Sequence, residues 1–169
     1  MSFDLNLVLN EQIAQQHGHK IRARVCGLLF EGDSVLLVKH LGLGPEGVFW
    51  APPGGGMEFG DSAEDNLIRE FKEETALDIE VIAPLFTFEY LSPPLHSIEL
   101  FFSVKKIGGK LAKGYDPEYD SSSQIIEEVK FVTFDDLGII PIKSLHHMLT
   151  LCPNPQDLLK MKGYFKFEK

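Results

Sequence analysis

The chain has 169 residues, of which 44% are hydrophobic and 24% charged, and its formal net charge is -9. These values are ordinary for a single globular domain and argue against a disordered or fibrous chain. Because an acidic chain repels a phosphate backbone, nucleic acid is not expected as the main partner. A small phosphate-containing ligand would need a cation between the two negative partners.

The sequence carries no signal for export or membrane insertion. Its first ten residues, MSFDLNLVLN, lack a basic region, and no stretch approaches the roughly 20 apolar residues of a membrane span. Cys26 and Cys152 are too few for a disulfide framework and have no metal-ligand spacing. We therefore expect a cytoplasmic protein without a membrane partner.

Composition along the chain indicates the domain organisation. Residues 1–20 are polar and mixed, and we expect them to form an N-terminal arm ahead of one domain over residues 21–169. Residues 21–40 hold two apolar runs around Glu31-Gly32-Asp33, which predicts a β-hairpin. Prolines and glycines then interrupt regular structure up to residue 56.

Residues 61–76, DSAEDNLIREFKEETA, are expected to form a helix because they contain good helix formers and neither proline nor glycine. A capping box of Asp61 and Glu64 is expected to begin this helix. Runs rich in β-formers then predict strands over residues 79–82, 85–91, 97–106 and 129–134. A sheet should therefore be built from segments on both sides of the helix.

The remaining segments are expected on the surface. Residues 113–124 are polar and predict a loop, whereas residues 135–150 and 155–162 predict outer helices. His146 and His147 would then lie on an exposed helix surface. Trp50, by contrast, is expected to pack in the core.

Three glutamates share one face of the predicted helix. At about 100° per residue, Glu70, Glu73 and Glu74 fall on an arc beside the apolar arc. In an arbitrary acidic helix this would be a solvated face. Here the helix dipole disfavours the two glutamates of the last turn by about 0.3 to 1 kcal/mol each. Glu70 and Glu74 are also like-charged i,i+4 neighbours, a repulsion that Arg69 offsets only in part.

A bound cation would stabilise such a cluster. Carboxylate oxygens suit Mg²⁺ or Mn²⁺, and protein-bound Mg²⁺ usually keeps several waters while it also binds substrate phosphates. The helix therefore predicts a metal site for phosphate chemistry.

The same helix carries a family motif. Gly55, Asp61 and the run REFKEETAL from Arg69 resemble the Nudix box, which reads Gly, five residues, Glu, seven residues, then Arg-Glu-aliphatic-x-Glu-Glu-x-Gly-aliphatic. Every spacing is kept, and the preceding WAPPGG and EFG stretches are also similar. The chain thus resembles the MutT-like Nudix hydrolase family, which implies an α/β/α sandwich with a mixed β-sheet.

The resemblance also implies an activity. Members of this kind are Mg²⁺-dependent hydrolases that cleave a diphosphate linkage, by water attack at phosphorus, in a nucleoside triphosphate, ADP-ribose or a nucleotide sugar. The expected partner is accordingly a small nucleotide-derived diphosphate, and a homodimer is compatible with the family.

Roles for individual residues follow from the same resemblance. The expected metal ligands are Glu70, Glu74, the backbone carbonyl of Gly54 and Glu73, which could instead aid catalysis. Arg69 would orient the glutamates. Glu127, with Glu128 as the alternative, is the expected base or further ligand outside the box, although an exposed strand start explains either residue equally well.

The box departs from the family pattern at three positions. Asp61 replaces glutamate and is expected to act mainly as the helix cap. Phe71 replaces an aliphatic residue and changes only packing. Ala76 replaces the glycine that ends the helix. We still expect a left-handed turn there, at a cost of about 1 kcal/mol, because Leu77 and Ile79 must leave the helix promptly to enter the next strand.

The same fold could also support two other functions. A non-catalytic nucleotide sensor is disfavoured because all three glutamates are present and no DNA-binding region is appended. An isomerase is disfavoured because neither cysteine lies in the box region. Pro93, 16 residues after Leu77, resembles the proline that marks ADP-ribose-cleaving members.

Overall fold

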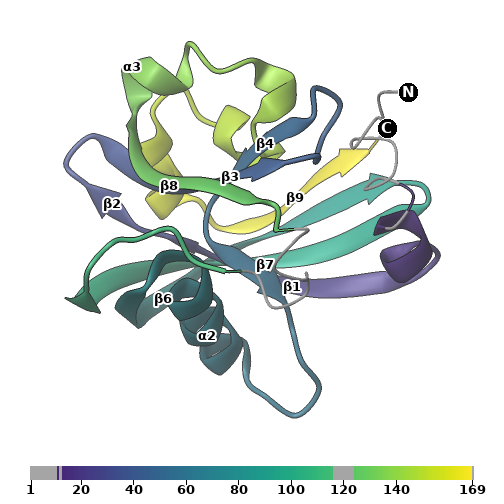
Figure 1. The fold of residues 1–169 in the computed structure, drawn as a ribbon, viewed down its shortest axis with the longest axis horizontal. Coiled ribbons are helices and arrows are strands. Elements are labelled where there is room, and N and C mark those ends of the chain that lie inside the picture. The colour runs from purple at the N-terminus through teal and green to yellow at the C-terminus, as the bar shows by residue number, and fades with distance from the viewer. Residues whose placement is uncertain (1–10, 12, 116–123, 169) are drawn as a thin grey trace.

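The computed structural model describes residues 11, 13–115 and 124–168, and it contains two β-sheets with one long helix (Figure 1). The five-stranded sheet has the order β5-β1-β7-β6-β9, and a second sheet joins β2, β3, β4 and β8. The first sheet consists of β1 (Ile21–Leu28), β5 (Gly54–Gly56), β6 (Leu77–Ser92), β7 (Leu95–Gly109) and β9 (Gly163–Glu168). The second consists of β2 (Phe30–Glu31), β3 (Ser34–Leu41), β4 (Val48–Ala51) and β8 (Ile126–Thr133).

The larger sheet is mixed, as the sequence predicts. β1 runs parallel to β7 and antiparallel to β5, while β6 runs antiparallel to β7 and parallel to β9. Together with the helix, this confirms the expected mixed α/β fold. None of the helices in the described part of the chain has the length and apolar composition that a membrane crossing requires.

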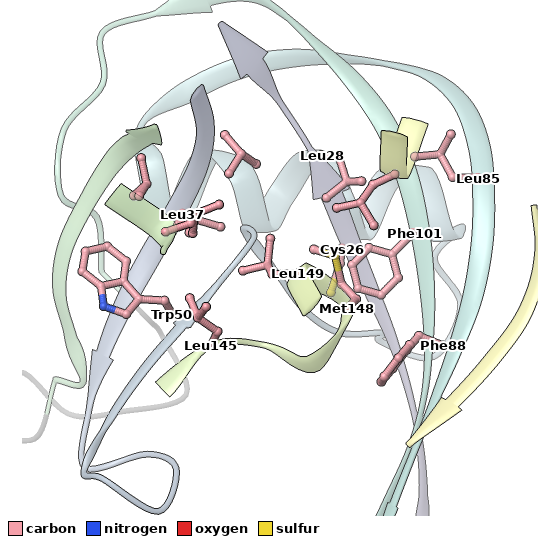
Figure 2. Packing of buried hydrophobic residues seen from close by; sticks show 14 of the residues in the cluster. Cys26, Leu28, Leu37, Trp50, Leu85, Phe88, Phe101, Leu145, Met148 and Leu149 are labelled. Atoms are coloured by element: carbon pink, nitrogen blue, oxygen red, sulfur yellow. The ribbon is translucent and has the colours of Figure 1, made fainter. Parts of the chain in front are cut away.

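Two cores hold these layers together. One lies between the sheets and contains Cys26, Trp50, Phe101 and Met148 among others (Figure 2). The burial of Trp50 in this core confirms the packing role predicted for it. The other core surrounds Leu67 and Phe71 of helix α2 (Ala63–Thr75).

Helix α2 begins one residue later than the capping box predicts. Ser62 is the N-cap, and its hydroxyl accepts a hydrogen bond from the backbone N–H of Asp65 at 3.1 Å. The prediction that Asp61 and Glu64 form the cap is therefore wrong. Two adjacent residues, Asp61 and Ser62, both have side chains suited to this position, and sequence alone did not separate them.

The end of α2 confirms the expected left-handed turn. Ala76 has φ 59° and ψ 11°, and its N–H donates to the carbonyl of Lys72 at 3.1 Å. The segment after β7 crosses this end of the helix: the N–H groups of Ala112, Gly114 and Tyr115 donate to carbonyls of the last turn. Residues 113–115, the beginning of the predicted polar loop, thus cap a helix, while residues 116–123 lie outside the described residues.

Several strand predictions need correction. The turn after Glu31 is present, but only Phe30 and Glu31 pair with β3, because β1 has already entered the other sheet. Residues 79–82 and 85–91 belong to one strand, β6, whose pairing with β7 is interrupted by three register shifts. β7 extends beyond its predicted range at both ends, whereas β8 begins three residues earlier than predicted and ends one residue earlier, at Thr133. Strand β9 was not predicted.

The two outer helices predicted near the C-terminus do not form. The chain instead makes the short helix α3 (Phe134–Leu137) and three 3₁₀ turns, η1 (Ile142–Ser144), η2 (His147–Thr150) and η3 (Pro155–Lys160). Pro141 lies inside the first predicted helix and lacks the backbone N–H that a continuous helix requires. Of the predicted N-terminal arm, residues 13–17 are helical, and the N–H of His19 donates to the carbonyl of Pro94.

We predict that Ala76→Gly stabilises the protein by about 1 kcal/mol, because glycine removes the Cβ strain of the left-handed conformation. Part of this gain is offset by the entropy that glycine adds to the unfolded chain. Denaturant melts measure the change. Ala63→Gly, at a right-handed helical position of α2, is the control and should destabilise; a lower midpoint for Ala76→Gly at unchanged slope would contradict the prediction.

Candidate active site

Glu70, Glu73 and Glu74 at the end of α2 are not on a solvated face. Glu70 is 9% exposed and Glu74 is 4% exposed, whereas Glu73 is half-buried. Full burial of an unpaired carboxylate is unfavourable, so such positions usually have a partner or a function. The helix thus places two neighbouring carboxylates inside the protein.

Strand β5 makes room for these carboxylates because it has no side chains. The N–H of Gly54 donates to Oε2 of Glu74 at 2.9 Å. A Cβ on Gly55 would collide with the carboxylate of Glu70, and a Cβ on Gly54 would collide with the backbone of Val25. Glycine is therefore required at both positions by close approach. The proposed role of the Gly54 carbonyl as a ligand remains a prediction.

Arg69 holds the outer side of the cluster. Its terminal nitrogens lie 3.0 Å from Oε1 of Glu70 and 2.9 Å from Oε2 of Glu73. They also lie 3.5 Å from Oε1 of Glu58 and 3.2 Å from Oδ1 of Asn66. This arrangement supports the orienting role predicted for Arg69, and it shows Glu73 held toward Arg69.

Electrostatics disfavour the ionised form of Glu70 when no cation is bound. Burial, followed by the charge of Glu74, raises the pKa of Glu70 to about 7, against the opposing effect of Arg69. A divalent cation would reverse this effect, because it favours ionised oxygens. The two buried carboxylates therefore fit the metal that the motif implies.

The donor set suits a hydrated cation. In the described parts of the chain, no three histidine, cysteine, aspartate or glutamate side chains are gathered so as to hold a metal ion by themselves. Mg²⁺ commonly uses one or two carboxylates with waters and substrate oxygens, whereas structural zinc needs four protein ligands. The chemistry of the site thus fits Mg²⁺ or Mn²⁺ better than zinc.

His40 joins the site from β3, and sequence reasoning missed it. Its side chain is buried, and Nε2 lies 3.7 Å from Oε1 of Glu74. Its Nδ1 has no hydrogen-bond partner among the described residues. A lone histidine in a strand carries no local signal, since the contact depends on how β3 lies beside the helix.

A second polar cluster, also missed, lies on the larger sheet. Nε of Arg24 on β1 is 3.3 Å from Oε1 of Glu99 on β7, and Nε2 of His146 is 2.8 Å from Oε2 of the same carboxylate. Glu99 and His146 are both buried. Burial alone would raise the pKa of Glu99, but its interactions with His146 and then Arg24 lower this pKa to about 2.

The prediction that His146 and His147 are exposed is therefore wrong. The N–H of His146 donates to the carbonyl of Trp50 at 2.8 Å, which draws the chain inward between η1 and η2. The ring of His147 stacks on Phe167 of β9 with centroids 3.7 Å apart. Both contacts depend on the chain leaving helical geometry before residue 146.

Glu127 lies beside the site. It is exposed and forms the extra residue of a bulge in β8, where Ile126 pairs with His40 and Glu128 pairs with Lys39. Within the described residues Glu127 makes no ion pair or hydrogen bond with the glutamates of α2. Glu128 lies 3.2 Å from the ammonium group of Lys130.

Comparison with known proteins identifies the family. The NUDIX domain model matches residues 20–149. An ADP-ribose pyrophosphatase of Methanocaldococcus jannaschii is 29% identical over 125 residues, which cover 73% of this chain and 66% of that protein. An RNA pyrophosphohydrolase of Nitratiruptor sp. is 28% identical over 122 residues, 69% of this chain and 77% of its own length.

Solved structures agree at the level of the fold. A NUDIX hydrolase from Nitrosomonas europaea superposes with a TM-score of 0.69 at 16% identity, covering 85% of this chain and 93% of that one. An ADP-ribose pyrophosphatase from Streptococcus suis has a TM-score of 0.57 at 19% identity, covering 85% and 98%. With the matching domain model and the buried box glutamates, these similarities show that the chain belongs to the Nudix family.

Proposed function

We propose that the protein is a Mg²⁺-dependent hydrolase, with Mn²⁺ as the alternative metal, that cleaves the diphosphate linkage of a small nucleotide derivative. Water attacks phosphorus, the phosphorus–oxygen bond of the anhydride breaks, and two phosphate-containing products leave. The observation that supports this most directly is the burial of Glu70 and Glu74 side by side with the pKa of Glu70 raised.

The residues of the site have separate proposed roles. Glu70, Glu74 and the carbonyl of Gly54 would hold the metal, with Glu73 as a further ligand or an aid to catalysis. The metal, when bound, would neutralise the diphosphate and polarise the phosphorus–oxygen bond. Arg69 keeps Glu70 and Glu73 in place through its two ion pairs. Strand β5 keeps bulky groups away from the carboxylates.

ADP-ribose is the first substrate to test. Two of the similar proteins, from Methanocaldococcus jannaschii and Streptococcus suis, bear the name ADP-ribose pyrophosphatase. Nucleoside triphosphates and nucleotide sugars are the alternatives within the same chemistry. The net charge of -9 disfavours a long RNA substrate, although one relative is named an RNA pyrophosphohydrolase.

Glu127 is the proposed base. Its side chain is exposed on the strand beside His40, whereas Glu128 is paired with Lys130. Among the described residues, the Glu127 carboxylate is free to turn toward a water molecule, whereas that of Glu128 is held by an ammonium group.

We predict that Glu70→Gln and Glu74→Gln each lower kcat by about 100-fold or more, because each removes a ligand charge while keeping side-chain volume. Turnover is measured at saturating Mg²⁺ on ADP-ribose, nucleoside triphosphates and nucleotide sugars. Without metal, both variants should melt no lower than the wild type, since like-charge repulsion is relieved. Glu64→Gln, exposed in the first turn of α2, is the matched control.

Two outcomes would refute the proposal. Turnover near that of the wild type in both variants would show that the glutamates are not the metal site. A wild-type protein that cleaves none of these compounds but binds one of them would favour a non-catalytic nucleotide sensor on the Nudix fold.

For the base, Glu127→Gln should lower kcat by at least about tenfold with little change in KM. Glu128→Gln is the matched control because it changes the neighbouring charge on the same strand, and it should retain near wild-type turnover. Equal effects of the two substitutions, or no effect of either, would remove Glu127 from this role.

A further inference from the structure

Strand β5 separates two sets of charged side chains. It is the edge strand of the larger sheet, and its successive residues face opposite sides. On one side, the missing Cβ of Gly55 leaves room for the carboxylate of Glu70; on the other, a Cβ on Gly56 would lie 2.7 Å from Nη2 of Arg22. Arg24 is the register partner of Gly56 and lies on the same face as Arg22. Arginines therefore line the strand opposite the glutamates.

One nitrogen of the Arg24 guanidinium is paired, and its side chain remains partly exposed. Its Nε pairs with Glu99, and its side chain keeps 27% of its surface exposed. In the described part of the chain, Glu99 is the only ion-pair partner of Arg24, and the two terminal nitrogens of Arg24 have no hydrogen-bond acceptor. Two terminal nitrogens of one guanidinium match two oxygens of a phosphate group.

Glu99, the ion-pair partner of Arg24, is itself held in position by a buried histidine. The N–H of Met148 donates to Nδ1 of His146 at 3.2 Å, which makes Nδ1 an acceptor and places the ring proton on Nε2. That proton faces Oε2 of Glu99, so His146 orients the carboxylate through this hydrogen bond. Glu99 therefore keeps its negative charge for Arg24.

The charge of Arg24 also acts on the proposed metal site. Burial lowers the pKa of Arg24, but the charge of Glu99, with smaller contributions from Glu74 and Glu70 among others, raises it above its ordinary value. The guanidinium is thus within electrostatic range of both proposed metal ligands. In an acidic protein, a cation at this position complements a metal in attracting a diphosphate.

We infer that Arg24 binds non-bridging oxygens of the substrate's diphosphate, and that Glu99, oriented by His146, is the positioning residue for Arg24. This inference rests on the proposed function, because the diphosphate is that of the proposed substrate. It adds to the metal site a fixed cation from the opposite face of β5.

The test uses imidodiphosphate, a diphosphate that resists hydrolysis and carries no nucleoside, titrated calorimetrically into the full chain with Mg²⁺. Arg24→Met should weaken binding at least about tenfold, the range for losing charge-assisted hydrogen bonds. Arg24→Lys should restore part of it, because charge returns without the forked geometry. Lys105→Met, an exposed charge on β7 roughly 20 Å along the strand from Glu99, should change binding less than twofold.

Mg²⁺ affinity separates a binding role from a structural one. Arg24→Met should leave Mg²⁺ binding unchanged or tighter, because a positive charge near the carboxylates is removed. Glu99→Gln should weaken imidodiphosphate binding without weakening Mg²⁺ binding. Since Arg24→Met leaves Glu99 with only its hydrogen bonds to His146 and Ser97, the double variant Arg24→Met/Glu99→Gln removes both charges and should bind as weakly as Arg24→Met.

The inference is overturned by wild-type affinity in Arg24→Met, by a parallel fall of Mg²⁺ affinity and melting temperature, or by a wild-type Mg²⁺ complex that does not bind imidodiphosphate. Failure of the proposed function looks different. A wild-type protein that binds imidodiphosphate through Arg24 but hydrolyses no anhydride would refute the hydrolase and retain the phosphate site.

Discussion

The structure depends on the burial of two neighbouring carboxylates against a strand made of glycine. Glu70 and Glu74 can lie inside the protein only because β5 has no side chains and supplies a backbone N–H at Gly54. The ionised form of Glu70 remains disfavoured, since its pKa stands near 7 despite the adjacent Arg69. This arrangement lowers the stability of the metal-free protein, and a bound cation would explain why the arrangement is present.

The surrounding fold compensates for placing anions near the end of a helix. Three backbone N–H groups from residues 112–115 cover the carbonyls of Glu73, Glu74 and Thr75. The left-handed turn at Ala76 then sends the chain at once into β6. The last turn is thereby fixed from outside the helix, and the two carboxylates keep a defined position without a continuing helix.

The sequence predicted the features that depend on residues close together in the chain. The 3.6-residue period placed the glutamates together, and motif spacing located the left-handed residue at Ala76. Contacts between distant segments could not be predicted from the sequence. Glu99 and His146 are 47 residues apart, and they meet only because the chain forms 3₁₀ turns after Pro141. The parallel pairing of β1 with β7, which sets Arg24 beside Glu99, has no local signature either. Where two signals competed, as at Asp61 and Ser62, the sequence did not decide the cap.

The most direct test of this account is calorimetric titration of Mg²⁺ into the metal-free protein and into the double variant Glu70→Gln/Glu74→Gln. The account predicts that the wild type binds Mg²⁺ and melts at a higher temperature when it is present, and that the double variant loses both effects while remaining folded. Mg²⁺ binding and stabilisation of the double variant equal to those of the wild type would contradict it.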